Sequence, residues 1–464
     1  MYKDTVTIGL MPTRRPIFKI ATAREEYDKI MPIIRAQMPK HVKFVDVDDI
    51  CEQGMAAQLY DIPKVVDKFK AAKVDALFIP FCDFGCEEVV VSVAKEFKFP
   101  ILIWGSRDKV TTFEKREKET QCGLFAATKV LRNYGVTFSY IFNCEYDSDI
   151  LVKGFEKFVR VASVMKKLRN LRVAEIGDRP APFFSVIHNQ LALIQNFGIT
   201  VVPIGLNAIK LRTDKIMEEN GAELNAYFAD YTTRIDCSAA EPDYIKRMCA
   251  CKMAIEAMMK EENCLCSALD CNGVSRVVEV PACAVQGELS DAGLPSSCET
   301  DVWGAISQLI CQAATLGEGT EFLADWTYRH PTNDNAELLW HGGPFAYSLA
   351  TKERKPRLKK SWTIQANWEL KQGEITTLRM DELDGKYYMF CDEGKTTTGP
   401  ETVGTWVWFE VDNWKRWEEK LMFGPYIHHV AGVYGRYKDV MREVCRYLGC
   451  VEFDEVDNRG PYSL

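Results

Sequence analysis

The sequence has no long hydrophobic run and no excess of basic residues. Its 464 residues include 58 Lys and Arg against 66 Asp and Glu, which gives a net charge of −8. Sequence-independent nucleic-acid binding needs clustered cations, and a bilayer-spanning helix needs roughly 18 to 20 apolar residues. Residues 1–4 also lead directly into a strand-like run, without an apolar signal segment. These absences predict a soluble, cytoplasmic protein that binds neither nucleic acid nor membrane.

The 17 cysteines are scattered and contain no paired Cys-x-x-Cys modules. An odd number of cysteines in a long chain is not a disulfide framework, because such frameworks belong to short secreted scaffolds. The spacing also lacks the pattern of a structural zinc site. We therefore expect most of these cysteines to be reduced and to pack as small hydrophobic side chains.

The N-terminal third alternates short apolar runs with amphipathic helical patterns. Strand-like runs rich in Val, Ile and Phe occur at 5–10, 43–47, 75–81, 100–105 and 137–143, with helical patterns at 23–36, 62–72 and 87–96. Alternating strands and helices predict a doubly wound parallel sheet. The first strand is not followed by Gly-x-Gly-x-x-Gly, so a dinucleotide site is not supported.

A second α/β pattern begins near residue 170, and the pattern changes after about residue 355. Residues 172–178 and 199–204 read as strands, whereas 185–195, 242–261 and 300–316 read as helices. Beyond 355, alternating apolar runs with Gly-containing turns predict an antiparallel barrel or sandwich. We predict an α/β fold with two doubly wound parallel-sheet domains, 1–168 and 169–354, followed by an antiparallel β-rich domain, 355–464. The charged segment 353–360 is interpreted as a solvated junction, with anion binding as the alternative.

Two carboxylates and a histidine in the second half are candidates for chemistry. Glu299 precedes an apolar helix, where it is either a helix-capping acid or a functional group. Asp325 interrupts an apolar run, where an unpaired carboxylate is costly, so it is either a salt-bridged strand acid or a functional group whose partner is a divalent metal ion. His341 lies where a strand-like run meets Gly342, a place from which a side chain can face a cleft.

Four segments of the second half resemble the L-fucose isomerase / L-arabinose isomerase superfamily of metal-dependent aldose–ketose isomerases. Residues 299–305 (ETDVWGA) resemble the glutamate-bearing motif of that family, and 322–328 (FLADWTY) resemble its second acidic segment. Residues 424–429 (GPYIHH) resemble the segment that presents a late histidine ligand, and the helix and strand that follow are similar in length. Segments 81–87, 103–105 and 187–189 resemble the two N-terminal domains of the family.

The resemblance implies a metal site and a sugar site. It implies that Glu299 and Asp325 are catalytic, and that Glu299, Asp325 and His429 are metal ligands. His341, because of its position at the end of a strand-like run, is the candidate for a fourth ligand. Oxygen and nitrogen donors without a thiolate suit Mn²⁺ or a similar octahedral cation. The resemblance also implies that Gln286 and Arg14 bind the substrate. Two further candidates come from the residues: His428 as a substrate contact or a packed histidine, and Trp303 as an aromatic wall for a sugar face or a core tryptophan.

The chemistry of an aldose–ketose isomerase matches these residue types. Moving a carbonyl between C1 and C2 through an enediol requires one group to remove a proton and another to return it. Either Glu299 or Asp325 can be the base. The resemblance further implies a homo-oligomer, a trimer or hexamer, with active sites shared between subunits and a monosaccharide as substrate.

Two other functions remain open. The first is an isomerase of the same fold that acts on an anionic sugar, sulfonated or phosphorylated, such as sulfoquinovose; the cationic Arg14 and Arg15 leave room for it. The second is a non-catalytic sugar-binding protein with paired α/β lobes, which would need neither a metal nor buried carboxylates.

Overall fold

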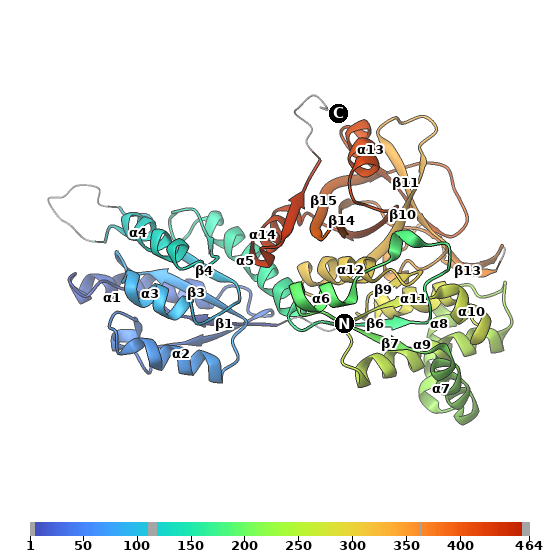
Figure 1. Ribbon diagram of the computed structural model, residues 1–464, viewed down its shortest axis with the longest axis horizontal. Coiled ribbons are helices and arrows are strands. Elements are labelled where there is room, and N and C mark those ends of the chain that lie inside the picture. The colour runs from blue at the N-terminus through green and yellow to red at the C-terminus, as the bar shows by residue number, and fades with distance from the viewer. Residues whose placement is uncertain (1–4, 110–117, 362, 457–464) are drawn as a thin grey trace. The chain divides into compact units, whose positions relative to one another are not determined.

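The apolar runs near the N-terminus form a five-stranded parallel sheet in the computed structural model, which describes residues 5–109, 118–361 and 363–456 (Figure 1). The strand order is β2-β1-β3-β4-β5. Nearly every side chain of β1, β3 and β4 is buried, as expected for a sheet covered on both faces. The strands are β1 (Val6–Leu10), β2 (Val42–Asp46), β3 (Ala76–Phe81), β4 (Ile101–Gly105) and β5 (Ser139–Tyr140).

Helices connect these strands and complete an N-terminal unit, residues 3–166 together with 442–447. Because β1 lies between β2 and β3, right-handed crossovers place α1 on one face of the sheet and α2, α3 and α4 on the other. The start of each helix therefore lies at the carboxyl edge of the strands. The helices are α1 (Ile20–Arg35), the 3₁₀ turn η1 (Glu52–Gly54), α2 (Asp61–Ala71), α3 (Glu87–Ala94), α4 (Thr120–Asn133) and α5 (Asp149–Leu168).

Residues 167–441 and the segment from 448 onward form a C-terminal unit, which begins with a second parallel sheet of order β7-β6-β8-β9. Its strands are β6 (Arg172–Ile176), β7 (Thr200–Ile204), β8 (Cys266–Leu269) and β9 (Ser296–Cys298). Its helices are η3 (Phe184–Val186), α6 (Gln190–Phe197), α7 (Leu206–Glu219), α8 (Ala222–Arg234), α9 (Pro242–Glu261), α10 (Cys271–Val277), α11 (Ala282–Asp291) and α12 (Val302–Ala314).

Six antiparallel strands then close a barrel in the order β16-β11-β10-β17-β14-β15, with β15 pairing back to β16. They are β10 (Glu321–Arg329), β11 (Ala336–His341), β14 (Glu374–Leu383), β15 (Lys386–Thr397), β16 (Thr405–Glu410) and β17 (His429–Tyr434). Strands β12 (Arg357–Lys360), β13 (Ile364–Glu369) and β18 (Val451–Asp454) extend the sheet. The remaining elements are η4 (Tyr347–Leu349), α13 (Trp414–Phe423) and α14 (Lys438–Leu448). Every residue of α12 is buried, and this helix packs against β9, β10, β14 and β17.

The predicted fold class is confirmed: two parallel α/β sheets precede an antiparallel barrel. The helix predicted over 185–195 starts later, at Gln190, because the side chain of Asn189 accepts a hydrogen bond from Ala192 N–H and caps it there. The barrel also takes β10 and β11 from the range that the sequence prediction assigned to the central domain. The domain boundaries themselves stay a prediction.

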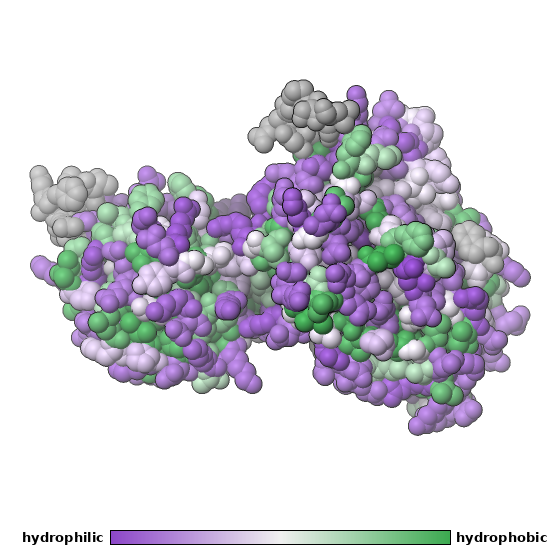
Figure 2. Space-filling view, in the orientation of Figure 1, coloured by the Kyte–Doolittle hydropathy of each residue, from purple (hydrophilic) through white to green (hydrophobic). Residues whose placement is uncertain are grey.

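Hydrophilic side chains cover much of the face shown in Figure 2, with apolar side chains in small groups between them. Among the helices that the structure describes, none is long and apolar enough to cross a membrane.

Candidate metal centre

Two neighbouring barrel strands bring Asp325 and His429 together. Strands β10 and β17 are antiparallel, and Asp325 is the direct partner of His429 in their register. Directly opposed residues of an antiparallel pair point to the same face, with Cβ atoms about 5 Å apart. His429 Nε2 accordingly lies 3.6 Å from Asp325 Oδ1. His429 is fully enclosed, whereas the Asp325 side chain keeps 20% of its surface exposed.

Glu299 reaches the same place from the turn between β9 and α12. Its backbone φ is +60° and that of Thr300 is +54°, so two consecutive residues other than glycine adopt the left-handed conformation. Each such residue costs on the order of 1–3 kcal/mol, and strain of this kind is concentrated at functional sites. The turn directs Glu299 Oε2 to 3.2 Å from His429 Nε2. Burial alone would raise the pKa of Glu299, but the neighbouring His429 lowers it and keeps the carboxylate ionised.

His341, at the end of β11, completes the cluster. Its Nε2 lies 3.8 Å from Asp325 Oδ1, and the donor atoms of Asp325, His341 and His429 all lie within 4.8 Å of one another. Its Nδ1 accepts a hydrogen bond of 2.8 Å from the backbone N–H of Gly342. In the neutral imidazole the proton is therefore on Nε2, which faces Asp325.

A buried carboxylate–guanidinium network holds His429 from behind. Asp301 Oδ2 lies 2.9 Å from His429 Nδ1, and both of its oxygens bond to the guanidinium of Arg379, which also contacts Asp381. Burial disfavours the ionised form of Asp301, but Arg379 and His429 hold its pKa well below the usual range. A ligating histidine commonly donates its second N–H to a carboxylate in this way. Asp301 therefore orients Nε2 of His429 toward Glu299 and Asp325.

Three buried polar atoms of this cluster, Asp325 Oδ1, His341 Nε2 and His429 Nε2, have no hydrogen-bond partner within the described part of the chain. Buried polar atoms are rarely left unpaired unless a ligand or ion satisfies them. Burial would lower the pKa of His429, yet the carboxylates of Asp301, Glu299 and Asp325 raise it to about 10. The same negative field favours a divalent cation in place of a proton, so the residues present fit a metal ion.

A thiol that the sequence did not predict also lies beside the cluster. The donor atoms of Cys298, Glu299 and His341 lie within 4.8 Å of one another. Hydrogen bonds with Cys271 and Cys283, together with burial, raise the pKa of the Cys298 thiol well above its usual value. A neutral thiol is a poor ligand for a hard cation, so the oxygen and nitrogen donors still define the site.

The other predicted residues lie in different surroundings. Trp303 is only 2% exposed and packs with Phe197 and Tyr387 in an aromatic cluster. Gln286 is fully buried, and its Nε2 donates a 2.7 Å hydrogen bond to Ser297 O in β9, the strand before Glu299. His428 is exposed but borders the cluster: its ring lies 4.4 Å from that of His429, and the donor atoms of Glu299, His428 and His429 lie within 4.8 Å of one another. Arg14 belongs to the N-terminal unit, where it is 5% exposed and pairs with Glu52.

Three further outcomes concern the acids of the site and Arg379. Asp301, not Glu299, caps α12 through a 2.9 Å bond from Gly304 N–H, so the helix-capping interpretation of Glu299 is wrong. Asp325 does lie on a strand, as the alternative of a salt-bridged strand acid requires. Its near neighbours are the imidazoles of His341 and His429, which form a salt bridge only when they are protonated. Asp301 and Arg379 were missed; the spacing Asp301-x-x-Gly304 before an apolar helix was the one signal for Asp301.

Comparison with known families agrees with this geometry. The profile of the fucose/sulfoquinovose isomerase N-terminal domain matches residues 9–169, and that of the L-fucose isomerase C-terminal domain matches residues 365–454. The chain belongs to the fucose/sulfoquinovose isomerase family. It is an aldose–ketose isomerase.

Curated relatives align with nearly the whole chain. A sulfoquinovose isomerase of Priestia aryabhattai is 22% identical over 454 residues, covering 96% of this chain and 98% of the relative, and one of Priestia megaterium has the same values. A sulfoquinovose isomerase of Alkalicoccus urumqiensis is 22% identical over 334 residues, or 70% of this chain and 73% of the relative. A member of this family acts on a sugar, and the carboxylate–histidine cluster is its candidate metal centre.

Proposed function

We propose that this chain interconverts a sulfonated aldose and its 2-ketose at the Glu299–Asp325–His429 cluster. The observation that carries the reaction type is the convergence of Glu299, Asp325 and His429, in which Asp325 Oδ1 and His429 Nε2 are buried without a hydrogen-bond partner among the described residues. The sulfonated substrate is supported by the relatives named sulfoquinovose isomerase, which align along 96% of this chain. An uncharged aldose, the first expectation from the sequence, is the competing substrate.

Glu299, Asp325 and His429 would hold the cation, and Mn²⁺ is the proposed ion. Two carboxylates and one imidazole form a hard donor set that suits an octahedral divalent cation and leaves positions for substrate oxygens. Such a cation acts as a Lewis acid that polarises the sugar carbonyl and stabilises the negative charge that develops on the sugar oxygens.

The side chains of this chain supply the proton transfers. One of the two carboxylates, Glu299 or Asp325, accepts the proton from the carbon next to the carbonyl and another group returns it. Nε2–H of His341 faces Asp325 Oδ1 at 3.8 Å, too far for a direct hydrogen bond, so it can donate to a sugar oxygen. A histidine that binds a metal through Nε2 carries its proton on Nδ1. In His341, Nδ1 accepts a hydrogen bond from the Gly342 N–H, which favours the tautomer with the proton on Nε2 instead. We therefore propose His341 as a hydrogen-bond donor; its predicted role as a fourth ligand remains untested.

The substrate is tested by following loss of the C2 proton signal of sulfoquinovose by NMR in D₂O, with the Mn²⁺-loaded protein. L-fucose and D-glucose serve as uncharged comparisons. We expect exchange and ketose formation with the sulfonated sugar and much slower turnover with the others, and prolonged chelation should abolish both. Full activity of the metal-free protein contradicts the metal-dependent mechanism. Faster turnover of an uncharged sugar contradicts the sulfonated substrate alone.

The ligand set is tested with the adjacent histidines. Donor atoms of both histidines lie within 4.8 Å of a Glu299 carboxylate oxygen, but His429 is buried in the cluster, whereas His428 is exposed. His429→Ala should purify with little metal and be nearly inactive, while His428→Ala should retain its metal. Metal content per subunit of the two purified variants is the measurement. If His428→Ala loses its metal and His429→Ala keeps it, the ligand assignment is wrong by one residue.

We also propose that the protein is a homo-oligomer, a trimer or hexamer, in which neighbouring subunits complete the sugar site. Closing a site across an interface helps to exclude water from the reaction. In this arrangement Arg14, His428, Gln286 and Trp303 stay proposed substrate-binding residues. Sedimentation at the assay concentration tests the proposal, and an active monomer contradicts it.

A further inference from the structure

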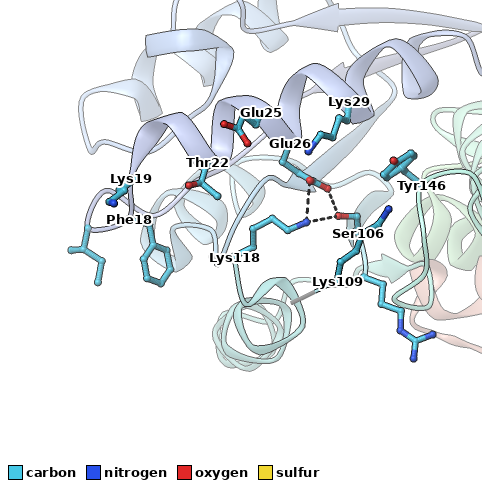
Figure 3. A pocket seen from close by; sticks show the side chains of 12 residues that line it. Phe18, Lys19, Thr22, Glu25, Glu26, Lys29, Ser106, Lys109, Lys118 and Tyr146 are labelled. Carbon is cyan, nitrogen blue, oxygen red and sulfur yellow. Dashed lines mark hydrogen bonds and ion pairs between the residues drawn. The ribbon is translucent and has the colours of Figure 1, made fainter. Parts of the chain in front are cut away.

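A basic pocket lies at the carboxyl edge of the N-terminal parallel sheet (Figure 3). The loop after β1 and the first half of α1 form one wall, and residues that follow β4 form another. Its volume is about 470 Å³, within the range of about 300–1,000 Å³ that is typical of small-molecule sites. In open α/β sheets, ligands bind at this edge of the strands. Every lining residue belongs to the N-terminal unit, so the pocket is separate from the metal centre.

The charge of the pocket is opposite to that of the whole chain. Its cationic lining residues are Lys19, Lys29, Arg107, Lys109 and Lys118, and its acids are Glu25 and Glu26. The pocket thus carries an excess of three positive charges in a protein of net charge −8. A concave wall lined by one sign of charge concentrates the field and attracts ions of the other sign.

At the floor of the pocket, the buried acid Glu26 is already neutralised by an ion pair with Lys118. Lys118 Nζ lies 3.0 Å from Glu26 Oε2 and donates a 3.3 Å hydrogen bond to Ser106 Oγ. The Ser106 hydroxyl in turn donates to Glu26. The side chains of Lys118 and Glu26 are 13% and 6% exposed, so this pair is part of the structure of the floor. Lys118 therefore neutralises Glu26 and leaves the other cations available.

Most of the remaining cations lack an anionic partner. Lys19, Lys29 and Arg107 make no ion pair with any residue that the structure describes, and Lys109 lies 3.9 Å from Glu145 with its side chain 65% exposed. Figure 3 shows the side chains of Lys29 and Lys118 on either side of Glu26, with Lys109 beside Ser106. Cations that line one pocket repel one another, and a bound anion relieves the repulsion.

The start of helix α1 adds a second, independent attraction for anions. This 16-residue helix begins in the pocket wall with no side-chain cap and no acidic residue in its first turn. Its N-cap position is occupied by Lys19, a cation at the positive end of the helix dipole, which is the unfavourable arrangement. Free N–H groups and a positive dipole end are a ready anion-binding site. Both features of α1 are explained if an anion binds beside Lys19 and Thr22.

We propose that this pocket binds a small molecule that carries a phosphate or sulfonate group. The cations of the wall and the start of α1 would contact the anionic group. The hydroxyls of Thr22 and Tyr146 and the volume of the pocket leave room for a polar body of about hexose size. This inference does not depend on which sugar the isomerase converts.

Calorimetric titration of the full-length protein with inorganic phosphate tests the proposal. Lys29→Gln/Lys109→Gln removes two exposed pocket cations, and Lys40→Gln/Lys64→Gln removes the same charge from exposed positions of the same unit. A hydrogen bond to a charged group contributes about 1.5–3 kcal/mol, so we expect the pocket variant to bind phosphate at least about tenfold more weakly. The control variant should change the dissociation constant less than about twofold.

Three further ligands identify the anionic group. D-glucose 6-phosphate and sulfoquinovose should both bind more tightly than D-glucose. Only the part of their affinity that the Lys29→Gln/Lys109→Gln variant loses belongs to the pocket, and the sugar that loses more identifies the source of the anion. Binding should also weaken as the ionic strength rises, because salt screens exposed charges. The proposal is overturned if phosphate does not bind saturably, if the pocket variant binds it as tightly as the wild type, or if D-glucose binds as well as its phosphate.

Discussion

At the scale of single residues, the least expected feature is the carboxylate behind His429. Asp301 and Asp381 both bond to the buried guanidinium of Arg379, but only Asp301 also bonds to His429. The two acids can be compared directly. Changing either one to an amide removes one negative charge beside Arg379, but only the change at Asp301 also alters the partner of the His429 imidazole. Asp301 is thus inferred to be a positioning residue for the metal centre.

We expect Asp301→Asn to weaken Mn²⁺ binding about 10- to 100-fold, the usual effect of removing the partner of a ligating histidine. Asn retains the helix cap, so the start of α12 should survive. Asp381→Asn should bind Mn²⁺ nearly as the wild type does. Metal affinity from titration, with circular dichroism to confirm folding, is the measurement. Equal losses of affinity in both variants would show that Arg379, not the Asp301–His429 bond, matters.

Glu321, also on β10, gives a prediction for pH-dependent stability. It is fully buried with one oxygen that lacks a partner among the described residues, and burial raises its pKa to about 8. The folded state therefore holds this proton more tightly than the unfolded state, whose pKa is near 4.3. Because the folded state binds more protons between these values, stability falls as the pH rises from about 4.3 to 8.

Glu321→Gln should remove this loss and raise the free energy of unfolding above pH 8 by about 1–3 kcal/mol, since the amide carries no charge to bury. Near pH 4.5 the variant and the wild type should differ little. Urea unfolding at both pH values measures the difference. Two results together would contradict a neutral buried acid at this position. They are a free energy of unfolding of the wild type that rises from pH 5 to 8, and a Glu321→Gln variant that is less stable than the wild type at pH 8.

At the scale of elements, the β10–β17 pair decides whether the site forms. Phe322 on β10 is the register partner of Gly432 on β17, three residues from Asp325 and His429 respectively. A Cβ on Gly432 would lie 2.2 Å from the ring of Phe322, which is 1% exposed. Glycine therefore allows these two strands to pair with a large aromatic ring between them.

Gly432→Ala should lower the free energy of unfolding by about 1–3 kcal/mol, because overpacking forces the strands apart. Phe322→Leu makes space, so the double variant should be less destabilised than the sum of the two single variants by more than about 1 kcal/mol. Denaturant unfolding of all four proteins gives this coupling energy. If the effects of the two substitutions simply add, a side chain at position 432 does not clash with the Phe322 ring in the folded protein.

The elements themselves were largely predictable, whereas the site was predictable only in part. Apolar runs located the strands of the first parallel sheet, β6 and β7 of the second, and the buried helix α12, because a two-sided sheet demands continuous Val, Ile and Phe. The three-residue strand β9 (Ser296–Cys298) was not predicted, because it has no apolar run. The pairing of Asp325 with His429 was not readable, since register between strands about 100 residues apart depends on the closed barrel. Arg379 gave no signal, because an alternating strand shows nothing that distinguishes a buried cation from an exposed one. Resemblance supplied Glu299, Asp325 and His429; packing supplied Asp301.

At the scale of the whole molecule, the chain has separate hydrophobic cores for its two units. One core lies around Phe69, Leu77 and Ile103 of the N-terminal unit, and the other includes Phe322, Val407 and Val430 of the C-terminal unit. The basic pocket belongs to the first unit and the metal centre to the second. Ligands of the two sites should therefore protect different parts of the same chain.

Hydrogen exchange of the full-length protein, followed by mass spectrometry, measures that separation. A ligand at about 100 times its dissociation constant stabilises the state it binds by about 2.7 kcal/mol, which slows exchange through opening of that state about 100-fold. Mn²⁺ should slow exchange in α12, β10 and β17 and leave α1 and β4 nearly unchanged. Phosphate should protect the start of α1 and the residues after β4, and leave β10 and β17 nearly unchanged. Equal protection of both units by Mn²⁺ would show that they open together rather than separately.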